Sequence, residues 1–198
     1  RRTFLKGTGA AAAAATLPSV LQNNSSAQSK PNVVFILADD MGYGDISYLN
    51  EKSKIATPNI NRIGQAGRFF TDAHSPSALC TPTRYGVLTG RYCWRTRITR
   101  GVCWGYSRHL IEPERMTVAS LLKSQGYNTA CIGKWHLGMD MQTRVGGVIQ
   151  DAHAVVDARA YKADIDWSAP ILNGPTSIGF DHFYGISASL DMYPYIWI

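Results

Sequence analysis

The stretch SALCTPTRYGVLTGRYCW, residues 77–94, has one cysteine directly in front of a predicted helix. Pro82 suits the first helical turn, where an N–H has no intrahelical partner, and Gly90 suits the end. Cys80 is then expected near free amides at the positive helix end, which stabilise an anion or an activated nucleophile. Arg84 follows one turn later and can face the same point. Taken alone, the pattern fits a buried structural thiol with an exposed arginine better.

Apolar runs that predict strands alternate with helical patterns around this stretch. Strands are expected at Val33–Leu37, Arg68–Ala73 and Tyr127–Ile132, and helices at Thr57–Gly67, Thr81–Gly90 and Thr117–Gln125. The less regular region 139–178 predicts an insertion or loop with one candidate helix near Ala152–Tyr161, and YPYIWI at 193–198 is typical of an interrupted strand. This alternation predicts an α/β fold, in which helices cover a sheet.

Polar side chains follow the ends of the predicted strands. Asp39 and Asp40 follow the first strand, Cys80 lies in the loop after the second, and Lys134 and His136 follow the third. Because ligands bind beyond the carboxyl ends of strands in such sheets, these residues predict one site.

Asp39 and Asp40 are adjacent carboxylates after a predicted buried strand. Two like charges this close are costly unless a cation neutralises them, and oxygen-only ligands favour calcium or magnesium. Taken alone, an Asp-Asp pair is more often solvated, or has one acid capping a turn.

Lys134 and His136 alternate on a segment predicted to be extended, so both can point to one side while Trp135 packs on the other. A cation beside an imidazole suits an oxyanion substrate and proton transfer. Combined with the cation site and Cys80, this set predicts cleavage of a charged oxyanion ester. Acyl transfer fits less well, because the chain has no GxSxG turn.

Four segments resemble motifs of one enzyme family, in the family's order. CTPTR at 80–84, continued by LTGR at 88–91, resembles the type I sulfatase signature, and GKWHLG at 133–138 resembles the second signature. ADDMGYGD at 38–45 is similar to the first metal loop, and GFDHFYG at 179–185 to an arylsulfatase segment. The resemblance implies an alkaline-phosphatase-like α/β/α sandwich with a mostly parallel central sheet, incomplete here.

The resemblance also implies a sulfuric ester hydrolase whose nucleophile is made from Cys80. In such sulfatases a separate maturation enzyme oxidises this cysteine to formylglycine. One hydroxyl of the aldehyde hydrate attacks sulfur and displaces the alcohol. The other hydroxyl then loses a proton and expels sulfate, which regenerates the aldehyde. Asp39 and Asp40 would bind Ca²⁺, which also contacts the residue made from Cys80 and polarises the ester.

The remaining roles follow from the same resemblance. Arg84 would hold the hydrate, Lys134 would bridge the hydrate and the sulfate oxygens, and His136 would take the hydrate proton. Ser189 matches a polar position that faces the substrate; a loop hydroxyl capping a turn is the other interpretation.

The start, RRTFLKGTGAAAAAATLPSVLQNNSSAQSK, has the layout of an export signal of the twin-arginine type. Residues 1–27 are expected to be this signal, and its apolar run is too short for a permanent membrane anchor. Its removal takes away three of the formal +6 charges and leaves +3, which gives no case for nucleic-acid binding. We therefore expect recognition by the twin-arginine export machinery and a periplasmic or secreted protein.

The four cysteines allow disulfides in an exported protein, and Cys93 and Cys103 could pair; buried free thiols fit equally well. Residues 28–198 are expected to be the N-terminal part of a sulfatase catalytic domain, inactive and poorly stable by itself. The alternatives are a phosphate or phosphonate ester hydrolase of the same superfamily and a non-catalytic domain that binds sulfated glycans. The substrate is expected to be an aryl or carbohydrate sulfate.

Overall fold

The computed structural model describes residues 30–149 and 164–198, so the predicted signal and the candidate helix near 152–161 lie outside the described residues. The chain divides into two units, Arg1–Ala38 and Asp39–Ile198. Every predicted site residue belongs to the second unit, which can be described by itself.

A parallel pair of strands forms the centre of the second unit. β1 (Ala130–Lys134) pairs with β2 (His182–Ile186), with Ala130 opposite His182. The pairing continues past both strands, because the amide of His136 donates to the carbonyl of Ser187 over 3.0 Å. Parallel strands end at the same edge of a sheet, so Lys134, His136 and the segment after β2 are brought to one edge.

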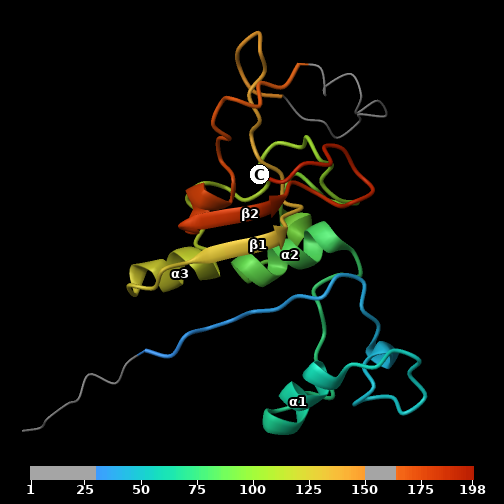
Figure 1. Ribbon diagram of the computed structural model, residues 1–198. Coiled ribbons are helices and arrows are strands. Elements are labelled where there is room, and N and C mark those ends of the chain that lie inside the picture. The colour runs from blue at the N-terminus through green and yellow to red at the C-terminus, as the bar shows by residue number, and fades with distance from the viewer. Residues whose placement is uncertain (1–29, 150–163) are drawn as a thin grey trace, which may run out of the picture. The chain divides into compact units, whose positions relative to one another are not determined.

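Three α-helices form close to where they are predicted. α1 spans Pro58–Ala66, α2 spans Cys80–Thr89 and α3 spans Val118–Ser124. α2 and α3 pack against each other, and Figure 1 shows both on one side of the two strands. Short 3-10 turns occur at Tyr43–Asp45 (η1), Cys93–Arg95 (η2) and Pro175–Ile178 (η3).

The ends of these helices follow local chemistry. At the start of α3, the Thr117 hydroxyl accepts from the amide of Ser120 over 3.0 Å, which satisfies a donor that has no intrahelical partner. At the end of α2, Gly90 takes a left-handed conformation (φ 65°) and its amide donates to the carbonyl of Gly86. Glycine adopts this backbone without the cost that a Cβ would impose, so α2 ends there.

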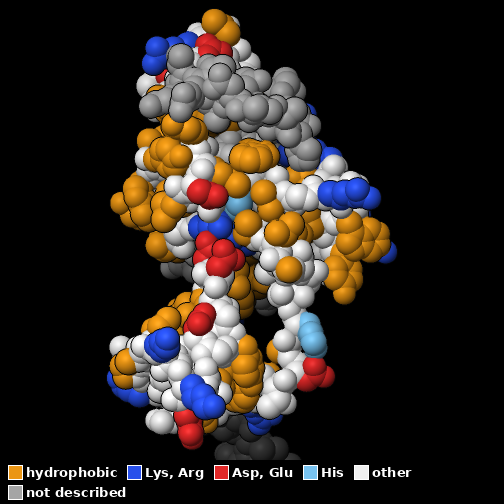
Figure 2. Space-filling model, turned by 90° about the vertical axis from the view of Figure 1, so that its right-hand side faces the viewer, with side chains coloured by type: hydrophobic (Ala, Val, Ile, Leu, Met, Phe, Trp, Pro, Cys, Tyr) orange, Lys and Arg blue, Asp and Glu red, His pale blue; other side chains and the backbone are white. Residues whose placement is uncertain are grey.

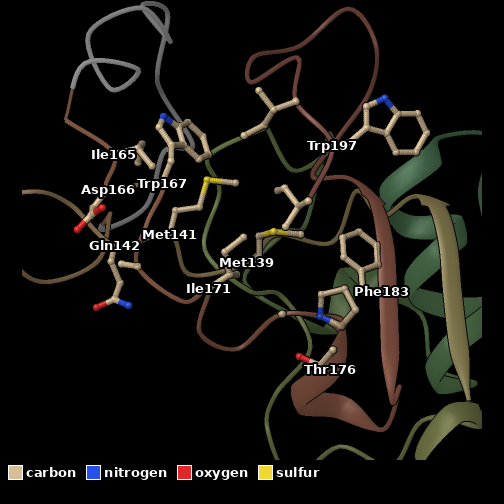
Figure 3. Close-up of a pocket in the computed structure, with 15 residues that line it drawn as sticks. Met139, Met141, Gln142, Ile165, Asp166, Trp167, Ile171, Thr176, Phe183 and Trp197 are labelled. Carbon is tan, nitrogen blue, oxygen red and sulfur yellow. The ribbon is translucent and has the colours of Figure 1, made fainter.

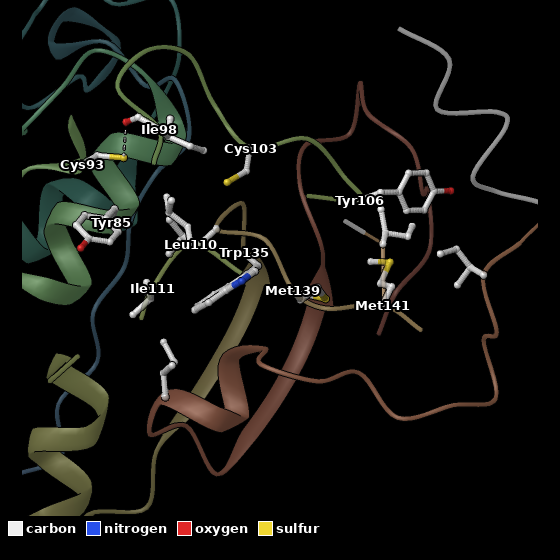
Figure 4. Packing of buried hydrophobic residues seen from close by; sticks show 14 residues of the cluster. Tyr85, Cys93, Ile98, Cys103, Tyr106, Leu110, Ile111, Trp135, Met139 and Met141 are labelled. Carbon is white, nitrogen blue, oxygen red and sulfur yellow. Dashed lines mark hydrogen bonds between the residues drawn. The ribbon is translucent and has the colours of Figure 1, made fainter. Parts of the chain in front are cut away.

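The buried core lies around Trp135, the residue between the two site candidates at the end of β1 (Figure 4). Its indole N–H donates to the carbonyl of Gly138 over 2.8 Å, and its ring packs edge-on against Phe180 and Phe183. The prediction that Trp135 turns into packing is therefore confirmed. Cys93 and Cys103 are both buried in the same core, and neither forms a disulfide.

Two predicted strands do not form among the described residues. Val33–Leu37 and Arg68–Ala73 have no strand partner, and the apolar side chains of the first run are exposed, from 39% at Leu37 to 82% at Val34. An apolar run indicates burial, but a strand also needs a neighbour to complete its hydrogen bonds. The segment 193–198 likewise lies outside both named strands, and the third predicted strand starts three residues late, at Ala130.

Candidate functional site

Three of the predicted site residues meet in an ion cluster. The Lys134 ammonium donates to the Asp39 carboxylate over 2.8 Å, and the Arg84 guanidinium lies 3.6 Å from the other carboxylate oxygen. Arg84 also donates to the backbone carbonyl of Lys134 over 2.6 Å, which ties α2 to the end of β1. Burial raises the pKa of Asp39, but the hydrogen bond and charge of Lys134 and the charge of Arg84 hold that pKa below its ordinary value.

Ser189 belongs to the same cluster. The Lys134 ammonium lies 3.3 Å from the Ser189 hydroxyl, within hydrogen-bonding distance. Ser189 follows β2 by three residues, at the edge where β1 also ends. Two cationic side chains and a hydroxyl thus lie together beside one carboxylate. The cations and the hydroxyl are donors that can hold a tetrahedral oxyanion through charge-assisted hydrogen bonds.

His136 is fully buried and lies two residues beyond Lys134. Burial, together with the positive charges of Lys134 and Arg84, lowers the pKa of His136 to about 4, so the imidazole is neutral near pH 7. Its Nε2–H donates to the carbonyl of Cys103 over 2.7 Å, while Nδ1 has no hydrogen-bond partner among the described residues. A neutral ring that donates at one nitrogen is a proton acceptor at the other.

The extended conformation predicted through His136 is wrong at His136 itself, which has a positive φ of 60°. Two residues later, Gly138 is also at positive φ and passes against the backbone carbonyl of Arg108. A Cβ at position 138 would overlap that carbonyl, so glycine is needed for the turn.

Thr81 is a site residue that sequence reasoning missed. Its hydroxyl donates to the carbonyl of His136 over 2.8 Å and accepts from the amide of Cys103 over 3.0 Å. The side chain is fully buried, so it fixes His136 and its partner Cys103 relative to the start of α2. No spacing rule in the sequence marks Thr81, because its partners are 22 and 55 residues away.

Cys80 is the first residue of α2, partly buried and not in a disulfide. The helix begins without a side-chain cap at Leu79, so its first amides are available to another group. With ten residues, α2 is long enough for its N-terminus to favour a negatively charged group beside Cys80.

Asp39 and Asp40 offer carboxylate oxygens suited to a hard cation such as calcium. The Asp40 backbone has a positive φ of 54°, and the chain bends at both acids. Within residues 30–149 and 164–198, no group of three or more Asp, Glu, His or Cys side chains is arranged so that it could hold a metal ion. The donor chemistry therefore fits calcium, but two carboxylates are a small part of the six to eight oxygens that calcium takes.

A pocket of about 660 Å³ lies elsewhere in the second unit (Figure 3). Its lining includes Met139, Met141, Trp167, Phe183 and Trp197. None of the predicted site residues lines it, and its walls are mostly apolar, so it is separate from the charged site.

The surface view in Figure 2 shows acidic, basic and histidine side chains next to one another near the middle of one face, among hydrophobic ones.

Comparison with solved structures gives the class of protein. A structure attributed to the metabolism of multiple glycosaminoglycans by Bacteroides thetaiotaomicron matches with a TM-score of 0.69 and 37% identity, over 85% of this chain and 31% of that one. The crystal structure of Ps i-CgsB matches with a TM-score of 0.58 and 28% identity, over 81% and 29%. The fold is that of the alkaline-phosphatase-like α/β enzymes, of which this chain contains part.

A family model then gives the family. The model described as Sulfatase matches residues 31–197, and the chain belongs to the sulfatase family. Residues 1–18 match the signal sequence of the twin-arginine translocation pathway, which directs export to the periplasm or beyond. Within the described residues, no helix is both long and apolar enough to cross a membrane.

Curated relatives agree with the family. The chain is 36% identical over 179 residues to an N-acetylgalactosamine-6-O-sulfatase of Bacteroides thetaiotaomicron, covering 90% of this chain and 31% of the relative. It is 41% identical over 124 residues to arylsulfatase A of Bos taurus, covering 63% and 24%, and 36% identical over 168 residues to human steryl-sulfatase, covering 82% and 24%. The chain thus spans less than a third of the length of these relatives.

Proposed function

We propose that the protein hydrolyses sulfate esters and that residues 28–198 contribute part of its catalytic domain. The observation that carries the proposal is the convergence of Lys134, Arg84 and Ser189 at the end of the sheet, next to a neutral buried histidine. Membership of the sulfatase family and the motif at Cys80 support sulfate over other tetrahedral anions.

In this proposal Lys134 and Arg84 bind the negatively charged oxygens of the ester. In the structure both cations contact Asp39, so an anionic substrate would enter a site that already neutralises negative charge. Ser189 would donate a further hydrogen bond from the side of β2. Binding of this kind stabilises the charge that develops on the oxygens in the transition state.

His136 would accept a proton through Nδ1. Its Nε2 is engaged by the Cys103 carbonyl, and burial keeps the ring neutral at the pH of the periplasm or cell exterior. A base must be unprotonated to act, so the lowered pKa favours this role. Thr81 would position the ring rather than take part in the chemistry.

Two groups that the family uses complete the proposal. Formylglycine made from Cys80 by a maturation enzyme would supply a hydrated aldehyde as the nucleophile. Calcium held by Asp39, Asp40 and the residue made from Cys80 would polarise the ester oxygens, and the ligand number of calcium implies more oxygen donors than these residues offer.

The test is hydrolysis of aryl sulfate and aryl phosphate by the whole protein, produced with a formylglycine-generating enzyme. We expect the sulfate to be turned over and Cys80→Ala to abolish turnover, because the nucleophile precursor is lost. Faster turnover of the phosphate would favour a phosphate or phosphonate ester hydrolase of the same superfamily. Binding of sulfated glycan without hydrolysis, unchanged in Cys80→Ala, would favour a binding domain.

We further propose a carbohydrate sulfate as the substrate. The relative with the longest match reported above is an N-acetylgalactosamine-6-O-sulfatase, and a solved relative is attributed to glycosaminoglycan metabolism. Release of sulfate from a sulfated polysaccharide at a higher kcat/KM than from an aryl sulfate would support this choice, and the reverse order would contradict it.

A further inference from the structure

Two aromatic rings are exposed on the segment that follows α2. Tyr92 and Trp94 are 55% and 58% exposed, and their rings stack with centroids 6.1 Å apart and planes 17° apart. Arg95 extends this surface, with its guanidinium carbon 5.3 Å from the centre of the Trp94 ring. We call Tyr92, Trp94 and Arg95 the aromatic ridge.

The ridge is held firmly by buried neighbours. Cys93, between the two rings in sequence, is buried, as is Ile98, and both belong to the core in Figure 4. Arg91 donates to the backbone carbonyl of Arg95 over 3.3 Å and forms an ion pair with Glu112 over 3.2 Å. Exposed rings on an anchored backbone lose little entropy on binding, which is typical of a recognition surface.

The charge around the ridge points to an anionic partner. Residues 91–109 contain five arginines and no aspartate or glutamate. Arg95 and Arg100 are exposed on this segment. A guanidinium recognises tetrahedral oxyanions by paired hydrogen bonds, while a flat indole offers an apolar face to the C–H groups of a sugar ring.

The same segment also reaches the candidate site. Nine residues beyond Trp94, the Cys103 carbonyl accepts the hydrogen bond from His136 and the Cys103 amide donates to Thr81. Trp104 follows at once and is 45% exposed. One arginine-rich segment therefore joins the ridge to the reaction centre.

We propose that the aromatic ridge binds an anionic polysaccharide chain outside the reaction centre, on sugar units other than the one that is cleaved. The proposal rests on the proposed function, because sulfate ester hydrolysis is what makes a sulfated sugar polymer the fitting partner. Stacked aromatic rings hold the sugar faces, and Arg95 holds their sulfate groups.

The experiment is affinity electrophoresis of the whole protein in gels that contain dextran sulfate, with neutral dextran as the reference. We expect Trp94→Ala to weaken retardation by dextran sulfate roughly tenfold, which corresponds to about 1.4 kcal/mol, because truncation removes the aromatic face that packs on the sugar. Arg95→Gln should weaken it several-fold and reduce its dependence on salt.

Trp197→Ala is the matched control. Trp197 is also 58% exposed and also stacks on a tyrosine, Tyr184, with centroids 5.1 Å apart, but it has no arginine over its ring in the part of the chain described. Its loss should leave retardation unchanged. Three results would overturn the proposal. The Trp94→Ala variant and the unchanged protein could be retarded equally, Trp197→Ala could weaken retardation as much as Trp94→Ala does, or dextran sulfate could fail to retard the unchanged protein.

Turnover of a small aryl sulfate, measured in parallel, separates this proposal from the proposed function. Loss of polymer binding in Trp94→Ala supports the ridge whether or not the protein hydrolyses the aryl sulfate. If turnover of the small substrate falls with polymer binding, the ridge is part of the reaction centre and the proposal is wrong. The proposal would also be overturned if the protein bound single-stranded DNA or anionic phospholipid vesicles more tightly than dextran sulfate and if Trp94→Ala weakened that binding.

Discussion

The burial of His136 has a consequence for stability at the scale of a single residue. The imidazole has a pKa of about 4 in the folded protein, below its ordinary value of 6.5. As pH falls through 6.5, the His136 imidazole is protonated in the unfolded chain. In the folded protein the same imidazole stays neutral until the pH approaches 4. The free energy of unfolding should therefore fall over this interval, by about 3 kcal/mol in total.

Denaturant unfolding at pH 7.5 and 5 checks this prediction. The carboxyl groups with lowered pKa values respond mainly at lower pH, and a comparison with His136→Gln separates His136 from the four other histidines of the chain. The loss on acidification should be smaller in His136→Gln than in the unchanged protein. An equal loss in both would mean that the buried histidine is not responsible.

Thr81 offers a second prediction at the residue scale. Thr81→Val keeps the shape of the side chain but leaves the buried His136 carbonyl and Cys103 amide without their partner. The variant should lose about 1–3 kcal/mol of unfolding free energy, whereas Thr81→Ser, which keeps the hydroxyl, should lose less. Chemical denaturation of the unchanged protein, Thr81→Val and Thr81→Ser measures these free energies of unfolding. Equal stability of the valine and serine variants would show that loss of the hydrogen bonds does not cause the destabilisation.

Single residues were predictable where a short motif marks them. Lys134, Arg84, Asp39 and Ser189 meet in the structure as their positions in the motifs led us to expect, although their roles stay a prediction. Thr81 was not predictable, because its importance lies in contacts with distant backbone groups.

Between elements, Asp181 links α3 to the start of β2. Its carboxylate accepts from Lys123 over 2.6 Å and from the amide of Thr129 over 2.8 Å, and these bonds lower the pKa of Asp181 to about 2. The stabilisation is present above pH 4 and disappears as pH falls toward 2. Asp181→Asn should lower the melting temperature at pH 7. Asp166→Asn should change it less, because the Asp166 carboxylate accepts from Ser168, only two residues along the chain.

Differential scanning calorimetry at pH 7 and 3 tests the link. The difference in melting temperature between Asp181→Asn and the unchanged protein should narrow at pH 3, because Asp181 is then mostly protonated in the unfolded chain, where its pKa has the ordinary value of 3.8. A constant difference at both values would show that the charge of Asp181 is not what stabilises this junction.

The turn after β1 gives another prediction for the elements. Gly138→Ala adds a Cβ at a positive φ and against the Arg108 carbonyl. The variant should be destabilised by about 1–3 kcal/mol, since strain at such a position has this size. Gly146→Ala, also at positive φ but with open space around it, is the matched control for the clash. Urea unfolding should rank the 138 variant as the less stable of the two, and the opposite order would contradict the role of the close approach.

Helices were easier to predict than strands here. Pro82, Thr117 and Gly90 are local start and stop signals, and the helices begin and end within two residues of the predicted places. Strands depend on partners far along the chain. The apolar run Val33–Leu37 predicted a strand, but hydrophobic residues alone do not specify a partner strand, and none pairs with this run in the described residues. The pairing of β1 with β2 joins residues about 50 positions apart, which no local pattern specifies.

For the molecule as a whole, the fold class and the family were predictable from four motifs in order, and the comparisons confirm both. The exposed ridge was not predicted, because a Tyr-Cys-Trp-Arg sequence acquires meaning only when its cysteine is seen to be buried and its rings exposed. The substrate depends on surfaces of the whole protein, of which this chain spans a part.

If the protein hydrolyses sulfate esters as proposed, Cys80 is the precursor of its nucleophile. The most direct test of this claim is mass spectrometry of the tryptic peptide Phe69–Arg84, from protein made together with a formylglycine-generating enzyme. We predict a peptide in which H₂S has been replaced by O and which reacts with a hydrazide. An unmodified thiol at Cys80, beside a control sulfatase that is converted in the same cells, would contradict the claim.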